Sequence, residues 1–185
     1  MAERVCPWWV GYFLLNPFRR LSQNPEKVLG PHIRSGMTVL DVGCAMGFFS
    51  LPMATMVGPD GRVVCVDLQE RMIRTLKKRA DKAGLADRID PRVCGAERLG
   101  LEDLNAKVDF ALAFFVIHEV PDAARLLAEI QSLLVPGGRL LIAEPKGHVK
   151  KAAFDDTVTA ACQAALSIVE RVDVRRSRTV LLEKL

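Results

Sequence analysis

The sequence VLDVGCAMG, residues 39–47, decides the predicted fold of this chain. A short apolar run predicts a β-strand over Thr38–Val42, and the small residues Gly43, Ala45 and Gly47 predict a turn after it. Small residues let the backbone come close to a ligand, and a helix that follows such a turn presents unpaired amide groups to a carboxylate or phosphate. We therefore expect a ligand-binding turn, followed by a helix from about Phe48 to Val57.

From Met37 onward, short β-rich runs alternate with longer helical stretches, which predicts a parallel sheet covered by helices on both faces. The further strands are expected at Arg62–Asp67, Ile89–Val93, Val108–Phe114 and Arg139–Ala143. The further helices are expected at Glu70–Ala83, Asp122–Leu134 and from Lys150 to about Leu166, with Gly84 ending the first and Pro136-Gly137-Gly138 marking the turn out of the second. Two last runs, Ile168–Val174 and Thr179–Leu182, are expected to form an antiparallel pair.

Length and composition predict a single domain over residues 1–185. Half of the residues are hydrophobic, which is enough for one sizeable core. The net charge of +4 is too small an excess to indicate a nucleic-acid-binding protein. The five cysteines have no spacing typical of disulfide frameworks or zinc sites, so we expect no metal and a cytoplasmic location. The apolar stretch from Trp8 to Leu15 is too short to span a membrane.

A second acid follows the second predicted strand. Asp67 lies 24 positions after Gly43, where a carboxylate can accept hydrogen bonds from both ribose hydroxyls of a nucleotide. Leu68 would then lie beside the adenine. An aspartate at a strand end can instead cap the next helix, and this alternative stays open.

These residues resemble motif I of class I S-adenosylmethionine-dependent methyltransferases, in which an acid precedes a Gly-x-Gly-x-Gly turn by two residues. Ala45 replaces the middle glycine. The resemblance implies an α/β three-layer sandwich. Its seven-stranded, mostly parallel sheet has the order 3-2-1-4-5-7-6, with strand seven antiparallel. It also implies an N-terminal helical lid over residues 1–36 and a Rossmann-like core over residues 37–185.

The same resemblance assigns the cofactor site. In the family the turn cradles the methionine part of S-adenosylmethionine, and the acid at Asp41 helps to arrange the loop and the ammonium end. The segment from Cys94 to Leu99 is similar to the family's Gly-Asp-Ala-Glu-like segment, with Gly95 in place of the acid that usually contacts adenine. The expected cofactor-binding residues are Asp41, Gly43, Ala45, Met46, Gly47, Asp67, Leu68, Ala96, Glu97 and Phe114.

The loop after the fourth predicted strand holds the candidate catalytic residues. Strands one and four are expected to meet at the switch point of the sheet, so Phe114 and His118 would face the transferred methyl group. His118 could deprotonate an acceptor, with Glu119 as a weaker candidate, or it could only hold the loop by a hydrogen bond. The aromatic segment before motif I supplies Trp9, Tyr12 and Phe13, which are candidates for the acceptor pocket or for core contacts.

The resulting prediction is a methyltransferase that transfers a methyl group from S-adenosylmethionine to a small molecule, without a metal. The chain looks similar to quinone-biosynthesis C-methyltransferases, and it lacks the Asn-Pro-Pro-Tyr-type loop of the DNA amino-methyltransferases. Two alternatives remain. One is a non-catalytic module that binds the same cofactor. The other is a nicotinamide-dependent oxidoreductase, whose usual Gly-x-Gly-x-x-Gly spacing differs from the spacing here.

Overall fold

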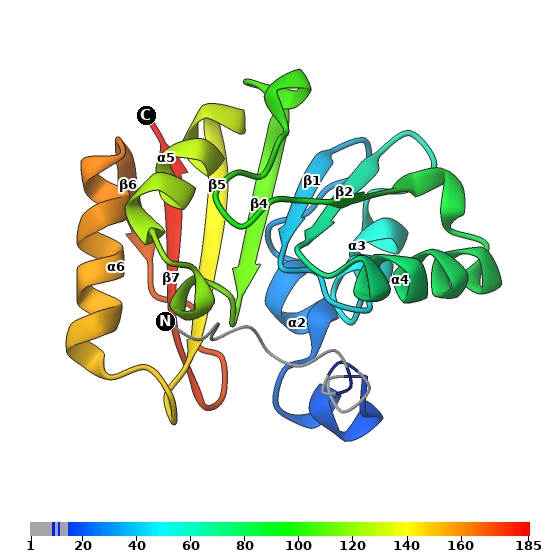
Figure 1. Ribbon diagram of the computed structural model, residues 1–185, viewed down its shortest axis with the longest axis horizontal. Helices are drawn as coiled ribbons and strands as arrows, with labels where there is room; N and C mark the ends of the chain where they lie inside the picture. The colour runs from blue at the N-terminus through cyan, green and yellow to red at the C-terminus, as the bar shows by residue number, and fades with distance from the viewer. Residues whose placement is uncertain (1–8, 10, 12–14) are drawn as a thin grey trace.

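The computed structural model describes residues 9, 11 and 15–185, which form a three-layer α/β fold (Figure 1). Seven strands make one sheet in the order β3-β2-β1-β4-β5-β7-β6. The strands are β1 Thr38–Val42, β2 Arg62–Asp67, β3 Ile89–Val93, β4 Val108–Phe114, β5 Leu134–Pro145, β6 Leu166–Glu170 and β7 Ser177–Lys184. Strand β7 runs antiparallel to both of its neighbours, and the other pairs are parallel. The predicted strand order is confirmed.

Helices cover both faces of the sheet, as is typical of central strands that are mostly apolar and buried. The helices are α2 Pro25–Leu29, α3 Ser50–Met56, α4 Glu70–Ala83, α5 Ala123–Leu133 and α6 Lys151–Gln163. Short 3₁₀ turns are η1 Pro17–Leu21, η2 Ala86–Arg88, η3 Glu102–Leu104 and η4 Ile117–Glu119. Leu40 and Val42 pack in one core with α5 and α6, whereas Val39 packs in a second core with α2, α3 and α4. This alternation is the two-residue period of a strand.

Strand β5 is longer than the predicted Arg139–Ala143, and the predicted turn at Pro136-Gly137-Gly138, where Gly137 has a φ of +75°, lies inside it. Leu134 follows α5 directly and pairs with Val108, whereas Arg139 pairs with Phe110, so the intervening residues form a bulge inside the strand. A Cβ on Gly138 would lie 2.8 Å from the Val135 carbonyl oxygen. The missing side chain therefore permits a bulge where the sequence pattern suggested a loop.

Other boundaries differ from the prediction as well: α6 ends at Gln163 rather than about Leu166, and β7 is longer, at Ser177–Lys184 rather than Thr179–Leu182. Helix α3 begins at Ser50 rather than Phe48, and β6 covers Leu166–Glu170 rather than Ile168–Val174. Val174 lies in a loop, but it is 3% exposed and packs in the core. Its apolar side chain therefore indicates burial and not a place in a strand. Helix α4 and its left-handed cap at Gly84 lie where they were predicted.

Turn η1, in dark blue, lies at the lower right of Figure 1 with α2 above it, and the arrowhead of β4 points downward. Helix α2 lies within the predicted helical lid, and the Asn24 side chain at its start accepts a hydrogen bond from the Lys27 amide. Turn η1 was not predicted. Tyr12 and Phe13 lie outside the described residues. None of the helices in the described part of the chain is long and apolar enough to cross a bilayer.

Candidate active site

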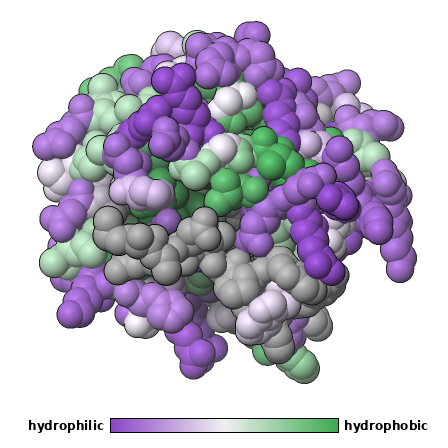
Figure 2. All heavy atoms as spheres, in the orientation of Figure 1, coloured by the Kyte–Doolittle hydropathy of each residue, from purple (hydrophilic) through white to green (hydrophobic). Residues whose placement is uncertain are grey.

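A cavity of about 890 Å³ lies at the carboxyl ends of the central parallel strands, where open α/β sheets bind their ligands. Its wall comes from the turns after β1 and β2, the loops after β3, β4 and β5, and the segment before α2. In the space-filling view, hydrophobic side chains are visible near the middle of this face within a hydrophilic rim (Figure 2). The predicted residues that line the cavity are Asp41, Gly43, Ala45, Met46, Asp67, Leu68, Ala96, Glu97, Phe114, His118 and Glu119.

The turn after β1 is held by the end of β2. The amides of Gly43 and Cys44 both donate to the Val66 carbonyl, at 2.9 and 3.0 Å. Gly43 has a φ of +68°, and a Cβ there would lie 2.6 Å from Cγ2 of Val116, so this position requires glycine. Ala45 also has a positive φ, of 48°. Two backbone amides of the turn thus hold it against the end of β2.

Gly47 is not part of the described cavity wall; it lies between the turn and helix α4. Its φ is +82°, and a Cβ would lie 2.3 Å from Cδ1 of Leu76 on α4. Arg79, one turn further along α4, donates a hydrogen bond to the Met46 carbonyl. Gly47 therefore lets α4 pack closely against the turn.

Asp67 joins the two turns of the cavity. Its Oδ2 accepts the Ala45 amide at 2.9 Å and its Oδ1 accepts the Gln69 amide at 2.9 Å. The side chain is 8% exposed, and burial raises its pKa despite the two backbone hydrogen bonds. Each carboxylate oxygen has two lone pairs, so both oxygens keep acceptor capacity for ligand hydroxyls. The alternative that Asp67 caps the next helix is wrong, because the N-cap of α4 is Gln69 and the helix has no side-chain cap hydrogen bond.

Asp41 is a buried acid at the floor of the cavity. The Ser50 hydroxyl donates to its Oδ2 at 2.6 Å. Burial raises the pKa of Asp41 to about 7, and the Ser50 hydrogen bond and the charge of Arg19 oppose this rise. The carboxyl group is thus poised to ionise when a cation comes near.

Arg19 on η1 is a cavity residue that sequence reasoning missed. Its guanidinium carbon lies 4.3 Å from the centre of the Phe48 ring and 5.7 Å from that of Phe114. Its Nε donates to Oε1 of Gln23 at 2.5 Å, and burial lowers the pKa of Arg19 to about 10. Its approach to motif I depends on how the N-terminal segment docks, which no local pattern encodes.

The rim near the loop after β3 is more open. Ala96 and Glu97 are exposed, and the Glu97 carboxylate lies 3.9 Å from Arg125 Nη1. Glu129 on α5 holds this loop, because its Oε1 accepts the amides of Leu99 and Gly100 at 2.8 and 3.3 Å. The predicted adenine-side residues therefore lie at the mouth of the cavity.

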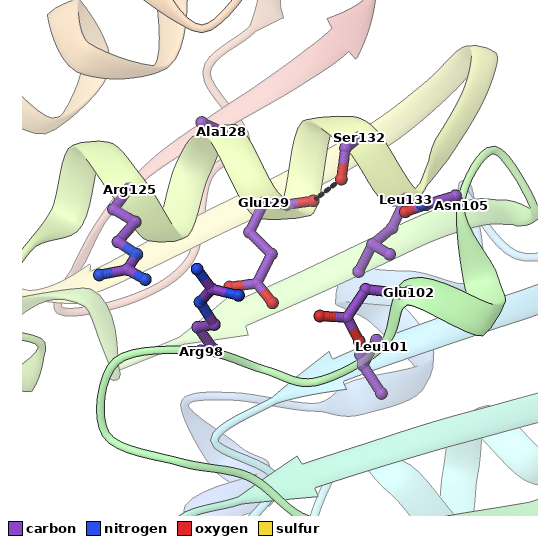
Figure 3. A pocket seen from close by; sticks show the side chains of 9 residues that line it. All are labelled: Arg98, Leu101, Glu102, Asn105, Arg125, Ala128, Glu129, Ser132 and Leu133. Carbon is purple, nitrogen blue, oxygen red and sulfur yellow. Dashed lines mark hydrogen bonds between the residues drawn. The ribbon is translucent and has the colours of Figure 1, made fainter.

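A second cavity of about 290 Å³ adjoins this rim, between α5 and the η3 turn (Figure 3). The side chains of Glu129 and Arg98 extend toward each other across it, while Arg125 lies one turn along α5 (Figure 3). Arg98, Arg125 and Glu129 line both cavities. The charges of these side chains and Glu102 balance, so the small cavity has no charge excess that would select a ligand.

His118 lies on η4 in the wall of the main cavity, and its partner is a buried acid that sequence reasoning missed. Nδ1 of His118 lies 2.5 Å from Oε2 of Glu144, whose side chain is 1% exposed. Oε1 of Glu144 accepts the backbone amides of Ile117 and His118 at 2.9 and 3.3 Å. The hydrogen bond from Glu144 raises the pKa of His118, and the charge of Glu119 adds to it.

Other expected groups fall outside this arrangement. Trp9 is 53% exposed and is not part of the described cavity wall, whereas Gly11 and Leu15 of the same segment line it. Cys44 is buried, and burial raises its thiol pKa well above the usual value, which fits a packing role. The described residues contain no group of three or more His, Cys, Asp or Glu side chains suited to hold a metal ion.

Comparison with known proteins places this geometry among methyl-transferring enzymes. Residues 33–178 match the family described as methyltransferase domain. The ubiquinone/menaquinone biosynthesis C-methyltransferase UbiE of Hahella chejuensis is 31% identical over 126 residues, which are 66% of this chain and 50% of that protein. The demethylmenaquinone methyltransferase of Symbiobacterium thermophilum is 33% identical over 119 residues, 64% of this chain and 47% of that protein.

The structural similarity extends over nearly the whole chain. The crystal structure of a SAM-dependent methyltransferase from Aquifex aeolicus superposes with a TM-score of 0.86 at 25% identity, covering 98% of this chain and 100% of that one. The matched region spans half or less of the curated relatives named above.

Proposed function

The chain belongs to the methyltransferase domain family, of the class I S-adenosylmethionine-dependent kind, and from this premise we propose that it transfers a methyl group from S-adenosylmethionine to a small organic molecule. The observation that carries the proposal is the cavity bounded by Asp41, the Gly43 turn and Asp67. The donor would occupy this cavity, and the acceptor would enter beside His118.

The residues present fit S-adenosylmethionine. Gly43 brings bare backbone to the cavity wall, and a side chain there would clash with Val116. Asp67 has free acceptor lone pairs for the ribose hydroxyls. Asp41 and Arg19 supply opposite charges at one end of the cavity, which suits the ammonium and carboxylate groups of the methionine end. The wall beside Leu68 suits an adenine ring.

When bound, S-adenosylmethionine supplies an electrophilic methyl group on a sulfonium sulfur. Phe114 and Phe115 line the cavity near His118, and their rings lie 4.5 Å apart, so they exclude water from this region. The walls hold donor and acceptor in line, which lowers the entropic part of the barrier. In this proposal His118 removes a proton from the acceptor; the charge of Glu119 raises the pKa of His118, which supports this role.

The acceptor is proposed to be a small molecule, because the named relatives act in ubiquinone and menaquinone biosynthesis. It would be bound by the loop that carries His118, by Pro145 and His148 after β5, and by the N-terminal lid. Trp9, Tyr12 and Phe13 stay proposed contributors from that lid. The described cysteines are free thiols, which suits the reducing cytoplasm.

The test is a calorimetric titration of the purified protein with S-adenosylmethionine, S-adenosylhomocysteine and NAD. We expect saturable binding of the two sulfur nucleotides and none of NAD. Binding of NAD alone would contradict the proposal. Binding of the sulfur nucleotides without transfer from methyl-labelled donor to any small acceptor would instead indicate a non-catalytic module.

A further inference from the structure

Glu144 and His118 form a pair whose geometry exceeds what holding a loop requires. The backbone amides of Ile117 and His118 both donate to one oxygen of Glu144, Oε1. The second oxygen, Oε2, is left for Nδ1 of His118 at 2.5 Å. A glutamine could accept the backbone amides equally well through its carbonyl oxygen. The second carboxylate oxygen is therefore specific to the imidazole.

The pair determines which ring nitrogen carries the proton. A carboxylate can only accept, so Nδ1 must donate, and Nε2 of the neutral ring must be the acceptor. Nε2 has no hydrogen-bond partner among the described residues, and none of their partnerless side-chain nitrogens or oxygens is buried. Because His118 lines the cavity, this accessible nitrogen lies at the wall where the acceptor would bind.

On the basis of the proposed function, we propose that Glu144 is a positioning residue that fixes His118 as a base, and that the acceptor is a protic group, a hydroxyl of the phenol or enol class. The acceptor oxygen loses its proton to Nε2 and forms the bond to the methyl carbon. The carbon–sulfur bond breaks, and its electron pair stays on sulfur. Glu144 stabilises the resulting imidazolium, which returns the proton to water.

The surroundings of His118 agree with this role. Among the described residues, three titratable groups face it: Glu144 from β5, Glu119 from η4, and His148 from the loop after β5, whose ring centre is 6.5 Å away. A thioether or tertiary amine acceptor has no proton to lose, so it would gain nothing from a buried carboxylate behind an imidazole. The pair thus indicates the chemical class of the acceptor.

The first experiment needs no acceptor. Imidazole ¹⁵N NMR of the full-length protein reports the tautomer and the pKa of each histidine, with His118 assigned from His118→Asn. We expect a protonated Nδ1 on neutral His118. In Glu144→Gln the amide NH₂ would face Nδ1, so the proton should move to Nε2 and the pKa should fall. Glu129→Gln is the matched control, because Glu129 also accepts two backbone amides but contacts no histidine. It should leave both readouts unchanged.

The second experiment measures transfer from methyl-labelled S-adenosylmethionine to hydroquinone and catechol, and to a thioether and a tertiary amine of similar size. We expect transfer to the phenols, a rate that rises with pH through the His118 pKa, and a loss of about 100-fold or more in kcat for Glu144→Gln. Cofactor affinity by calorimetry should stay unchanged in this variant.

These arms separate the two proposals. A protein that binds no S-adenosylmethionine refutes the proposed function, while the NMR result still decides the pairing. A wild-type tautomer with Nε2 protonated, or an unchanged tautomer in Glu144→Gln, overturns the positioning role. If cofactor binds but methyl transfer is confined to the acceptors without a removable proton, or reaches neither set, the assigned acceptor class is wrong. An unaltered kcat in Glu144→Gln would also contradict the positioning role of Glu144.

Discussion

Asp41 illustrates how one residue can link folding and ligand binding. Burial holds its pKa at about 7 in the free protein, so at pH 6 the carboxyl group is mostly protonated. A bound ligand with positive charge at this end of the cavity favours the ionised form. The Ser50 hydroxyl, which donates to Oδ2, stabilises that form as well.

We therefore predict that S-adenosylmethionine binding at pH 6 releases up to one proton and that the release vanishes near pH 9, where Asp41 is already ionised. Calorimetric titrations in buffers with different ionisation enthalpies measure this number directly. Asp41→Asn should abolish the release and weaken binding. Release of the same size at both pH values would exclude Asp41 as its source.

Asp67 allows a sharper test of the ribose contact, because its carboxylate also holds the Ala45 amide. Asp67→Ala should lower the affinity for S-adenosylhomocysteine by about tenfold or more, since each lost hydrogen bond is worth about 1 kcal/mol. Asp67→Ala also removes the hydrogen bond to the Ala45 amide, so a distorted turn could itself lower the affinity. A deoxyribose analogue of the ligand is the control that separates the two effects. The analogue should bind wild type more weakly than the parent ligand but bind Asp67→Ala equally well. Equal penalties in both proteins would mean that Asp67 supports only the turn.

At the scale of elements, glycine positions show which turns are locked by packing. Gly47 and Gly84 both have positive φ, at +82° and +66°. A Cβ at Gly47 would collide with Leu76 of α4, whereas a Cβ at Gly84 would meet nothing within 4 Å. The backbone strain of an alanine at positive φ is similar at both sites. The difference in unfolding free energy between the two alanine variants therefore measures how closely the turn packs against α4.

We predict that Gly84→Ala lowers the free energy of unfolding by about 1 kcal/mol, whereas Gly47→Ala lowers it by at least twice as much. Urea denaturation of the two variants measures both values. Adding Leu76→Ala to Gly47→Ala should cost less than the sum of the two single changes, because the closer of two clashes is removed and only that with Cδ1 of Leu51 stays. Simple additivity would argue against direct packing between the turn and α4.

At the scale of the whole molecule, the buried acid affects stability across a defined pH range. The folded pKa of Asp41, about 7, lies above the ordinary value of 3.8 that applies to the unfolded chain. Between these values the folded state binds more protons than the unfolded state, so the contribution of Asp41 to stability falls as pH rises. Above pH 7 the full destabilisation is present.

Asp41→Asn should therefore raise the melting temperature of the free protein at pH 8 and have a smaller effect, or none, at pH 4.5. Differential scanning calorimetry of both proteins over pH 4–9 tests this, and the difference between them isolates Asp41 from the other titrating groups. Saturating ligand should reverse the order at pH 8, because wild type binds more tightly and gains more stability. A stabilisation independent of pH would show that Asp41 does not titrate as assigned.

The sequence alone determined the strands, their order and most of the cofactor-side wall of the cavity. The reason is local: β1, β2 and β4 are short apolar runs, and residues such as Asp41 and Asp67 follow from their places at strand ends. Chain order and the resemblance to a known family then specified which strand ends meet. The boundaries of β5 and β6 were mispredicted because burial and bulging do not follow the two-residue period.

Only the tertiary structure decided the pairing of Glu144 with His118 and the position of Arg19 near Asp41. The bulge in β5 sets the register so that Ala143 lies opposite Phe114; an unbroken ladder from the Val108–Leu134 pair would place Leu140 there. The bulge thus brings Glu144 to the loop that carries His118. Contacts between residues 26 positions apart depend on the register of neighbouring strands, which is set by packing and hydrogen bonding across the sheet and not by local sequence.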